Sequence, residues 1–276
     1  MPSMKSSVIE WLFFDKLGFR TNGSIGSGVV TMGDVVDGIE ATASGLSKSN
    51  PANFFKDITR NNPDMIWPAS VLAAGFTGED AIGTAPQAVF RFVPLPAGQL
   101  TAFPPPLAPS AAMLASPHTI QSLSMPISTK ALGRSDENWL AQVAARLHVV
   151  ETYFAQFSPN LMAEVTFLQT GVKLPQGEAD SAYSVVDSSG ETWLVSVEAK
   201  GRREKIHPPQ IHRAAASLLQ TSAAQATCGV IPMAMKVVSV STIYIVEFEK
   251  LRVPTDPLAK VGEGVLRLVP DVAGIA

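Results

Sequence analysis

The stretch GEADSAYSVVDSSGETWLVSVEAK, residues 177–200, decides the fold. Polar and apolar residues alternate on both sides of Asp187-Ser188-Ser189-Gly190, and the composition of those four residues is typical of a turn. The alternation predicts one strand over 179–186 and a second over 192–199. Since a turn this short joins only antiparallel neighbours, the two strands are expected to form a hairpin.

The register of this hairpin brings two acids together. A hairpin centred near Ser189 pairs residues whose numbers sum to about 378, and Asp180 with Glu198 satisfies that sum. Directly paired side chains lie about 5 Å apart, and like charges at that separation destabilise a sheet. A divalent cation between the carboxylates removes the conflict, because Mg²⁺ prefers hard oxygen ligands.

Lys200 completes the pattern. Alternation along the second strand places it on the face of Glu198. An ammonium group there can hold a nucleophilic water or stabilise the charge of a phosphoryl transition state. The segment therefore predicts a divalent-metal site that cuts nucleic-acid phosphodiester bonds.

Two other interpretations of these residues stay open. A carboxylate–x–lysine triplet is a short pattern, and a solvated strand face with a cross-strand ion pair would also show it. In addition, a shifted register would make Glu178 the metal ligand in place of Asp180.

Composition limits the class of protein. The chain has 276 residues, of which 46% are hydrophobic, enough for one large domain or two small ones. Neither a membrane span nor a secretory signal is evident in the sequence. Cys228 is the only cysteine, which excludes an intramolecular disulfide and suggests a cytoplasmic setting. The net charge of −3 does not indicate nucleic-acid binding, although a cleft can be basic within an acidic chain.

The chain is expected to have three parts. Residues 1–93 are predicted to be mainly helical, with one helix capped by Thr31 and a strand at 88–93. Residues 94–134 contain a proline-rich stretch, which predicts an extended connector. Residues 135–276 alternate helices and strands, which predicts an α/β core. Besides the hairpin, this core is expected to contain a helix at 136–157 capped by Ser135, a helix at 209–224, and strands at 228–234 and 243–248.

The order of elements in this part of the chain resembles the PD-(D/E)XK nuclease superfamily. An acid is followed by a hairpin, Glu-x-Lys, a helix and two more strands. The resemblance covers about residues 137–250. Its motifs VKLPQGEADSAYSV, VSVEAKGRREKI and PPQI are similar to those of type II restriction endonucleases, as is NPANFFKDITRN near the N-terminus. One position departs from the pattern, because Ala179 stands where many members have proline.

The resemblance implies a restriction-endonuclease-like fold, with a mixed β-sheet flanked by helices, and roles for individual residues. Asp180 and Glu198 would bind Mg²⁺, for which Mn²⁺ would substitute, with the carbonyl of Ala199 as a further ligand. Lys200 would be the catalytic lysine. Glu151 would complete the site or remain a surface glutamate, and Gln210, which opens the helix after Glu-x-Lys, would lie near the site.

The resemblance also implies an activity and partners. The protein would be a type II restriction endonuclease, a homodimer that cleaves double-stranded DNA at a specific sequence and has a companion DNA methyltransferase. A same-fold nuclease of DNA repair or RNA processing, and a non-catalytic nucleic-acid-binding protein, are the alternatives. Basic residues after Lys200 and in the N-terminal region would contact DNA: Arg202, Arg203, Lys205, Lys56 and Arg60. The alternative is a solvated loop for the first three and an exposed helix face for Lys56 and Arg60.

Overall fold

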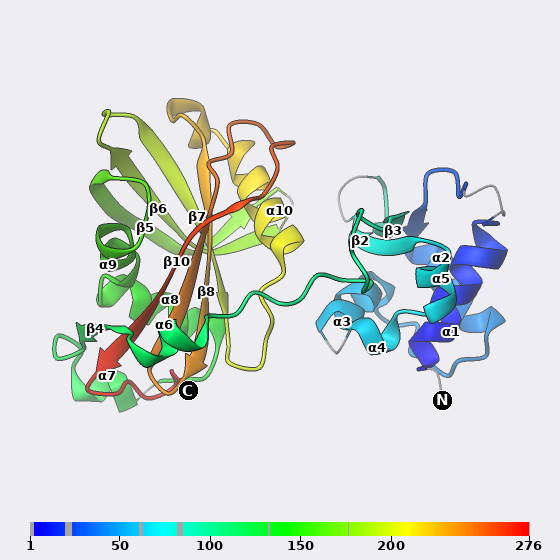
Figure 1. The fold of residues 1–276 in the computed structure, drawn as a ribbon, viewed down its shortest axis with the longest axis horizontal. Coiled ribbons are helices and arrows are strands. Elements are labelled where there is room, and N and C mark those ends of the chain that lie inside the picture. Colours follow the sequence, from blue (N-terminus) through cyan, green and yellow to red (C-terminus); the bar gives the residue numbers. More distant parts are fainter. Residues whose placement is uncertain are drawn as a thin grey trace. The chain divides into compact units, whose positions relative to one another are not determined.

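The chain folds into two compact units, Met1–Pro105 and Pro106–Ala276, in a computed structural model (Figure 1). The division falls inside the proline-rich stretch, and the rest of the expected connector belongs to the second unit. The structure describes residues 3–19, 24–60, 63–81, 85–131, 133–175 and 177–275. Within these ranges, no helix has the length and apolar character needed to cross a bilayer.

The first unit combines short helices with a three-stranded antiparallel sheet of order β1-β3-β2. The helix expected after Thr31 is α2, where Thr31 and Asp34 form a capping box. The expected strand at 88–93 is β3, whereas β1 and β2 were not predicted. The elements are α1 (Met4–Trp11), β1 (Val29–Thr31), α2 (Met32–Ala41), α3 (Phe54–Arg60), α4 (Pro63–Ile66), α5 (Ala69–Ala73), β2 (Phe76–Asp80) and β3 (Ala88–Pro94), with a π-helical turn at Leu12–Lys16 and a 3₁₀ turn at Pro51–Asn53.

The second unit is built on a twisted seven-stranded sheet of order β4-β10-β9-β8-β7-β6-β5. The β7–β8 and β10–β4 pairs are parallel and the other pairs antiparallel, so the sheet is mixed. Its strands are β4 (His118–Gln121), β5 (Met162–Leu174), β6 (Gly177–Asp187), β7 (Thr192–Lys200), β8 (Val230–Ser239), β9 (Thr242–Phe248) and β10 (Lys260–Val269).

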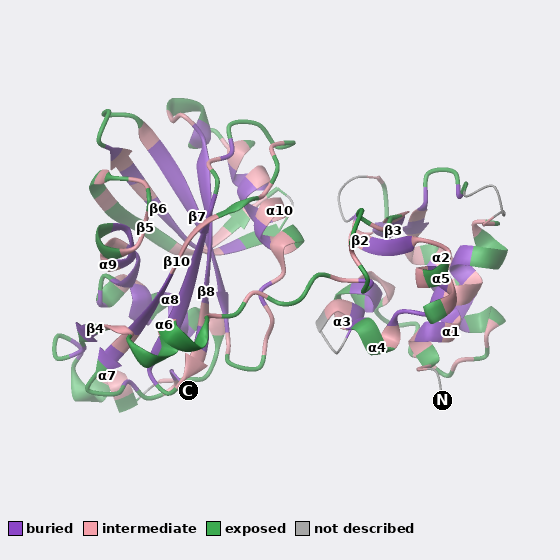
Figure 2. Cartoon of the chain, viewed as in Figure 1, coloured by how far each residue is buried: buried purple, intermediate pink, exposed green. Residues whose placement is uncertain are grey.

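Helices cover both faces of this sheet (Figure 1). Apolar residues of α8 (Glu137–Arg146) and α9 (Val149–Gln156) pack on one face, and those of α10 (Pro208–Leu219) pack on the other. Two short helices, α6 (Ala111–Ala115) and α7 (Ile127–Ala131), precede them, and a 3₁₀ turn follows α10 at Ala224–Ala226. The central strands are buried on both faces, as Figure 2 shows. The expected α/β architecture, a mixed sheet flanked by helices, is confirmed at this level.

The helix predicted over 136–157 is two helices. His148 adopts a left-handed conformation with φ 52° and separates α8 from α9. The cap also differs from the prediction, because the side chain of Asp136, not that of Ser135, accepts a hydrogen bond from the backbone N–H of Trp139 at 2.8 Å. The apolar stripe is nevertheless continuous, since both helices contribute buried residues to one core.

The predicted hairpin is confirmed, with its register. Ser181 pairs with Val197 and Ala182 with Ser196 across β6 and β7, as a hairpin centred near Ser189 requires. Alternation along β7 is confirmed as well, because Trp193, Val195, Val197 and Ala199 enter the core beneath α8 and α9. Leu194 packs against α10 on the opposite face. Three strands of the sheet were not predicted, namely β4, β5 and β10.

Candidate metal centre

The site lies where the β6–β7 hairpin meets the start of α8. Asp180 is near the beginning of β6, and Glu198 is near the end of β7. Asp180 lies one position beyond the Ser181–Val197 pair. Its Oδ2 accepts a 2.7 Å hydrogen bond from the backbone N–H of Ala199. This contact fastens the Asp180 carboxylate to β7 beside Glu198.

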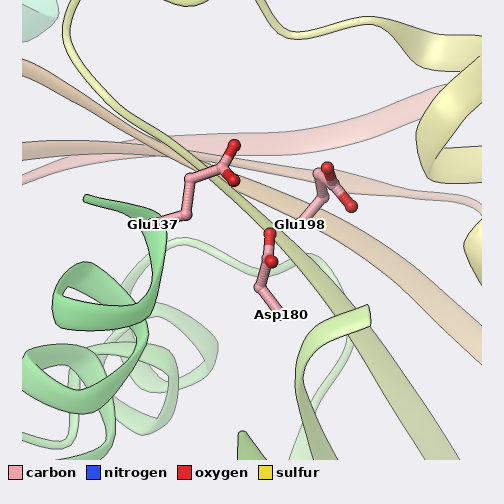
Figure 3. A group of neighbouring side chains, drawn as sticks. All are labelled: Glu137, Asp180 and Glu198. Carbon is pink, nitrogen blue, oxygen red and sulfur yellow. The ribbon is translucent and has the colours of Figure 1, made fainter. Parts of the chain in front are cut away.

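Glu137, the first residue of α8, is the third acid of the site. Glu137, Asp180 and Glu198, here called the acidic trio, each offer a carboxylate oxygen, and these oxygens lie within 4.8 Å of one another. Figure 3 shows the three carboxyl groups directed into one space. Asp136 caps the same helix, which makes Glu137 its first residue, and the packing of α8 on the sheet brings that first turn to the site.

Lys200 lies against this trio and is almost fully buried. Its Nζ donates to Oε1 of Glu198 at 2.6 Å and to Oε1 of Glu137 at 2.7 Å. An ammonium group has three N–H donors, and these are its two hydrogen bonds among the described residues. One donor therefore remains for a water molecule or a substrate oxygen.

Helix α10 contributes an amide to the same acid. The Nε2 of Gln210 donates to Oε1 of Glu198, so the structure brings Gln210 to the site. Arg213, one turn further along α10, interacts electrostatically with Glu198. Lys200 and Gln210 thus donate to the same oxygen of Glu198, Oε1.

Burial and mutual repulsion perturb the charges of the site. Burial, followed by repulsion from Glu198, raises the pKa of Asp180 to about 7, although the Ala199 N–H opposes the change. Burial also raises the pKa of Glu198. For Lys200, burial acts to lower the pKa, but Glu198 and Glu137 together outweigh burial and raise it. Carboxyl groups with raised pKa values in one cluster are typical of functional sites.

The donor set of the trio suits a hard divalent cation. Three carboxylates supply oxygen ligands, the kind that Mg²⁺ prefers, and water or substrate would fill the remaining positions. Two oxygens bound to one Mg²⁺ lie at most about 4.2 Å apart, and two bound to Ca²⁺ at most about 5 Å apart. The three carboxylate oxygens lie within 4.8 Å of one another. A small rotation of the side chains would therefore bring them to the separation that either ion requires. The residues fit the metal that the sequence predicted.

Two acids considered from the sequence lie outside the trio. Glu151 is in the first turn of α9, where its Oε1 is 3.1 Å from Nδ1 of His148. Glu178 is exposed on β6 and forms an ion pair with Lys173 of β5. The observed register therefore brings Asp180, not Glu178, to Glu198, and α8, not α9, supplies the helical acid.

The basic residues expected to contact DNA lie in two places. Arg202, Arg203 and Lys205 are in the loop between β7 and α10, directly after Lys200, and the two arginines are exposed. Lys56 is exposed on α3 of the first unit. The side chain of Arg60, on the same helix, lies outside the described part of the structure.

Sequence reasoning missed Glu137. The available signal was an acid at the first position of a helix, directly after the Ser-Asp capping residues. That position indicates only a favourable helix terminus, and nothing local connects it with the hairpin. Comparison of the chain with protein-family models, curated proteins and solved structures found no match.

Proposed function

We propose that the protein is a Mg²⁺-dependent nuclease with a restriction-endonuclease-like core. The observation that supports this most directly is the convergence of Glu137, Asp180 and Glu198 next to the buried Lys200. The reaction is the hydrolysis of a phosphodiester bond. The oxygen of water bonds to phosphorus, and the bond from phosphorus to one ester oxygen breaks.

The trio would hold the metal, and Mn²⁺ would substitute for Mg²⁺. When bound, the ion neutralises phosphate charge and increases the acidity of water. Ala199 has two parts in this arrangement. Its N–H orients the Asp180 carboxylate, and its carbonyl is the further metal ligand that the family resemblance suggests.

Lys200 would act on the reacting groups. Its two hydrogen bonds fix Nζ between Glu137 and Glu198, so its remaining N–H is available to orient the attacking water or a phosphate oxygen. The side chain is almost fully buried, and a charge in such surroundings stabilises a developing negative charge more strongly than one in water. Gln210 would keep the Glu198 carboxylate in place through its amide.

The more specific proposal is a type II restriction endonuclease. It rests on the motif resemblance and on the loop after β7, whose Arg202, Arg203 and Lys205 follow the site directly and suit phosphate contact. Lys56 and Arg60 of the first unit are further candidates for DNA contact. The enzyme would be a cytoplasmic homodimer, because two symmetric half-sites are matched by two subunits, and a DNA methyltransferase would protect the host.

One observation favours a non-catalytic alternative. Lys200 already forms ion pairs with two of the three acids, so the cluster also fits a structural charge network in a nucleic-acid-binding protein. A metal-binding site should take up Mg²⁺ with a rise in melting temperature, because a ligand that binds only the folded state stabilises it. A structural network should not respond.

Incubation of the purified protein with phage DNA and Mg²⁺ tests the function. Discrete fragments support restriction, and a smear supports a nonspecific nuclease of repair type. In a parallel incubation with RNA, cleavage of the RNA while the DNA stays intact would indicate RNA processing. Intact nucleic acid under several ionic conditions, together with retained binding, would favour the non-catalytic alternative.

The Lys200→Ala variant tests the site itself. We expect cleavage to be lost while DNA binding in Ca²⁺ is retained, because Lys200 acts on the reacting groups. Circular dichroism controls for folding, since removal of one partner leaves Glu137 and Glu198 without their cation. A folded Lys200→Ala protein that cuts at the normal rate would show that the catalytic assignment is wrong.

A further inference from the structure

A second lysine, Lys236 of β8, lies beside Lys200 in the sheet. The two residues are Cα partners across the parallel β7–β8 pair. Partners in adjacent strands are about 4.8 Å apart and direct their side chains to the same face. Lys236 therefore shares the face of Glu198 and Lys200, one strand further from Asp180.

The two lysines differ in how their charges are compensated. Lys200 is held between Glu137 and Glu198. Lys236 is half-buried, and within the described part of the chain its side chain forms no hydrogen bond or ion pair. Burial lowers its pKa, with Glu204 opposing the change and Lys205 adding to it. The charged form of Lys236 is therefore poorly compensated by the protein.

Glu204 compensates the charge of Lys236 only in part, because its carboxylate also binds the backbone. Its Oε2 accepts a 2.9 Å hydrogen bond from the backbone N–H of Gly201 and so closes the loop after β7. The same loop carries Lys205 and ends at the buried Ile206. Ile206 packs with Tyr244, the residue of β9 that pairs with Lys236. Lys205, next to Ile206 in the chain, is close enough for its charge to lower the pKa of Lys236.

The charges of Lys236 and Lys205 repel each other, and Glu204 supplies a single negative charge beside them. One positive charge of the three groups is therefore left over, and a bound anion would compensate it. A phosphate diester supplies one negative charge and accepting oxygens, and lysine binds phosphate as a point charge. The position is adjacent to the metal centre, where a nucleic-acid backbone would pass.

We propose that Lys236, together with Lys205, binds a backbone phosphate of double-stranded DNA next to the phosphate that is cut. This inference rests on the proposed nuclease function, since it makes Lys236 a DNA-binding residue of that site. Lys236 contacts the DNA directly. It anchors the strand without touching the reacting atoms.

The test measures the salt dependence of binding to a short fluorescein-labelled DNA duplex of mixed sequence, by anisotropy in Ca²⁺. A contact to one phosphate contributes about 0.9 to the slope of log K against log salt concentration. We expect Lys236→Met, which keeps the alkyl stem, to make this negative slope less steep by about 0.9, irrespective of sequence. Lys236→Arg should restore it. Lys236→Gln provides a second neutral variant if the methionine protein folds poorly.

Lys260→Met is the matched control. Lys260 is the first residue of β10 and forms an ion pair with Glu263. It also lies away from Lys236, because the residue of β10 in register with Lys236 across β9 is Val265, five positions further along the strand. Its loss should leave the slope unchanged. An unchanged slope in folded Lys236→Met or Lys236→Gln protein overturns the proposal.

Failure of this inference is distinguishable from failure of the proposed function. Wild-type protein that binds DNA with salt dependence but never cleaves it contradicts the nuclease assignment, and Lys236 can still be shown to bind phosphate. Wild-type protein that cleaves DNA while the Lys236 variants keep the normal slope contradicts only the role of Lys236. Wild-type protein with no salt-dependent binding overturns both.

Discussion

The backbone N–H of Ala199 donates a 2.7 Å hydrogen bond to Oδ2 of Asp180. This bond crosses from β7 to β6, and it places the Asp180 carboxylate against the strand that carries Glu198 and Lys200. It also favours the ionised form of a carboxyl group that burial and Glu198 otherwise disfavour. The chain therefore holds an acid at a position where its charge is costly, and this is the condition that a bound cation would relieve.

Asp180→Asn should increase the stability of the metal-free protein above neutral pH. The folded-state pKa of Asp180 is about 7, above the ordinary 3.8, so its ionisation favours the unfolded state. Asparagine removes this cost, and its carbonyl can still accept the Ala199 hydrogen bond. Linkage sets an upper limit of about 4 kcal/mol on this cost, and solvent screening reduces the expected gain to about 2 kcal/mol at pH 8, in urea unfolding with EDTA.

The stability difference between Asp180→Asn and wild type should depend on pH through the titration of Asp180. Stability from protonated Asp180 is complete below about pH 3.8 and is lost as the pH rises to about 7. The advantage of the variant should grow over that interval and stay constant above it. In Mg²⁺ the wild type should instead be the more stable of the two proteins, since only the wild type keeps all three carboxylates to bind the ion. A variant that is less stable than wild type at pH 8 without metal would contradict the prediction.

Glu137→Gln and Glu151→Gln form a matched pair that tests which helical acid serves the site. Glu137 lies in the trio and Glu151 lies in α9 beside His148. We expect Glu137→Gln to weaken Mg²⁺ binding at least about tenfold, and Glu151→Gln to leave it near the wild-type value. Isothermal titration with Mg²⁺ or Mn²⁺ provides the measurement. If Glu151→Gln weakened Mg²⁺ binding and Glu137→Gln did not, the helical acid of the site would be Glu151, as the family resemblance suggests.

Asp187 should stabilise the hairpin in a pH-dependent manner. It accepts hydrogen bonds from Ser189 Oγ, the backbone N–H of Glu191 and Nε1 of Trp193. The Ser189 hydroxyl and Lys250 hold the pKa of Asp187 well below its ordinary value. This stability is present above about pH 3.8 and is lost as the pH falls further.

Asp187→Asn should therefore lower the melting temperature at pH 7, and the difference from wild type should shrink in acid. Thermal unfolding followed by circular dichroism across pH gives the comparison. Ser188→Ala is the control, because Ser188 is exposed in the same turn. Equal melting temperatures for Asp187→Asn and wild type at pH 7 would show that the turn does not depend on this carboxylate.

The second unit should fold and bind metal without the first. Its sheet has its own core beneath α8 and α9, and all three trio acids belong to it. We expect a protein of residues 106–276 to unfold cooperatively and to gain melting temperature on addition of Mg²⁺. An unfolded fragment would show that the first unit supports this core, whereas a folded fragment without a metal response would contradict the metal centre.

The sequence by itself determined the hairpin and its register. Residues 187–190 set a turn, and period-two alternation assigned each side chain of β7 to a face. These are local properties, because the turn and the strands it joins are continuous in the chain. Asp180, Glu198 and Lys200 could therefore be placed together without any knowledge of the rest of the fold.

Only the tertiary structure decided what surrounds that hairpin. Glu137 reaches the site because α8 packs on the sheet, and the left-handed His148 ends α8 and gives α9, with Glu151, its own position. Lys236 becomes a neighbour of Lys200 through the pairing of β7 with β8, which follow each other only after the crossover through α10. Such contacts depend on the packing of apolar faces from distant segments, and no short-range pattern encodes which face meets which.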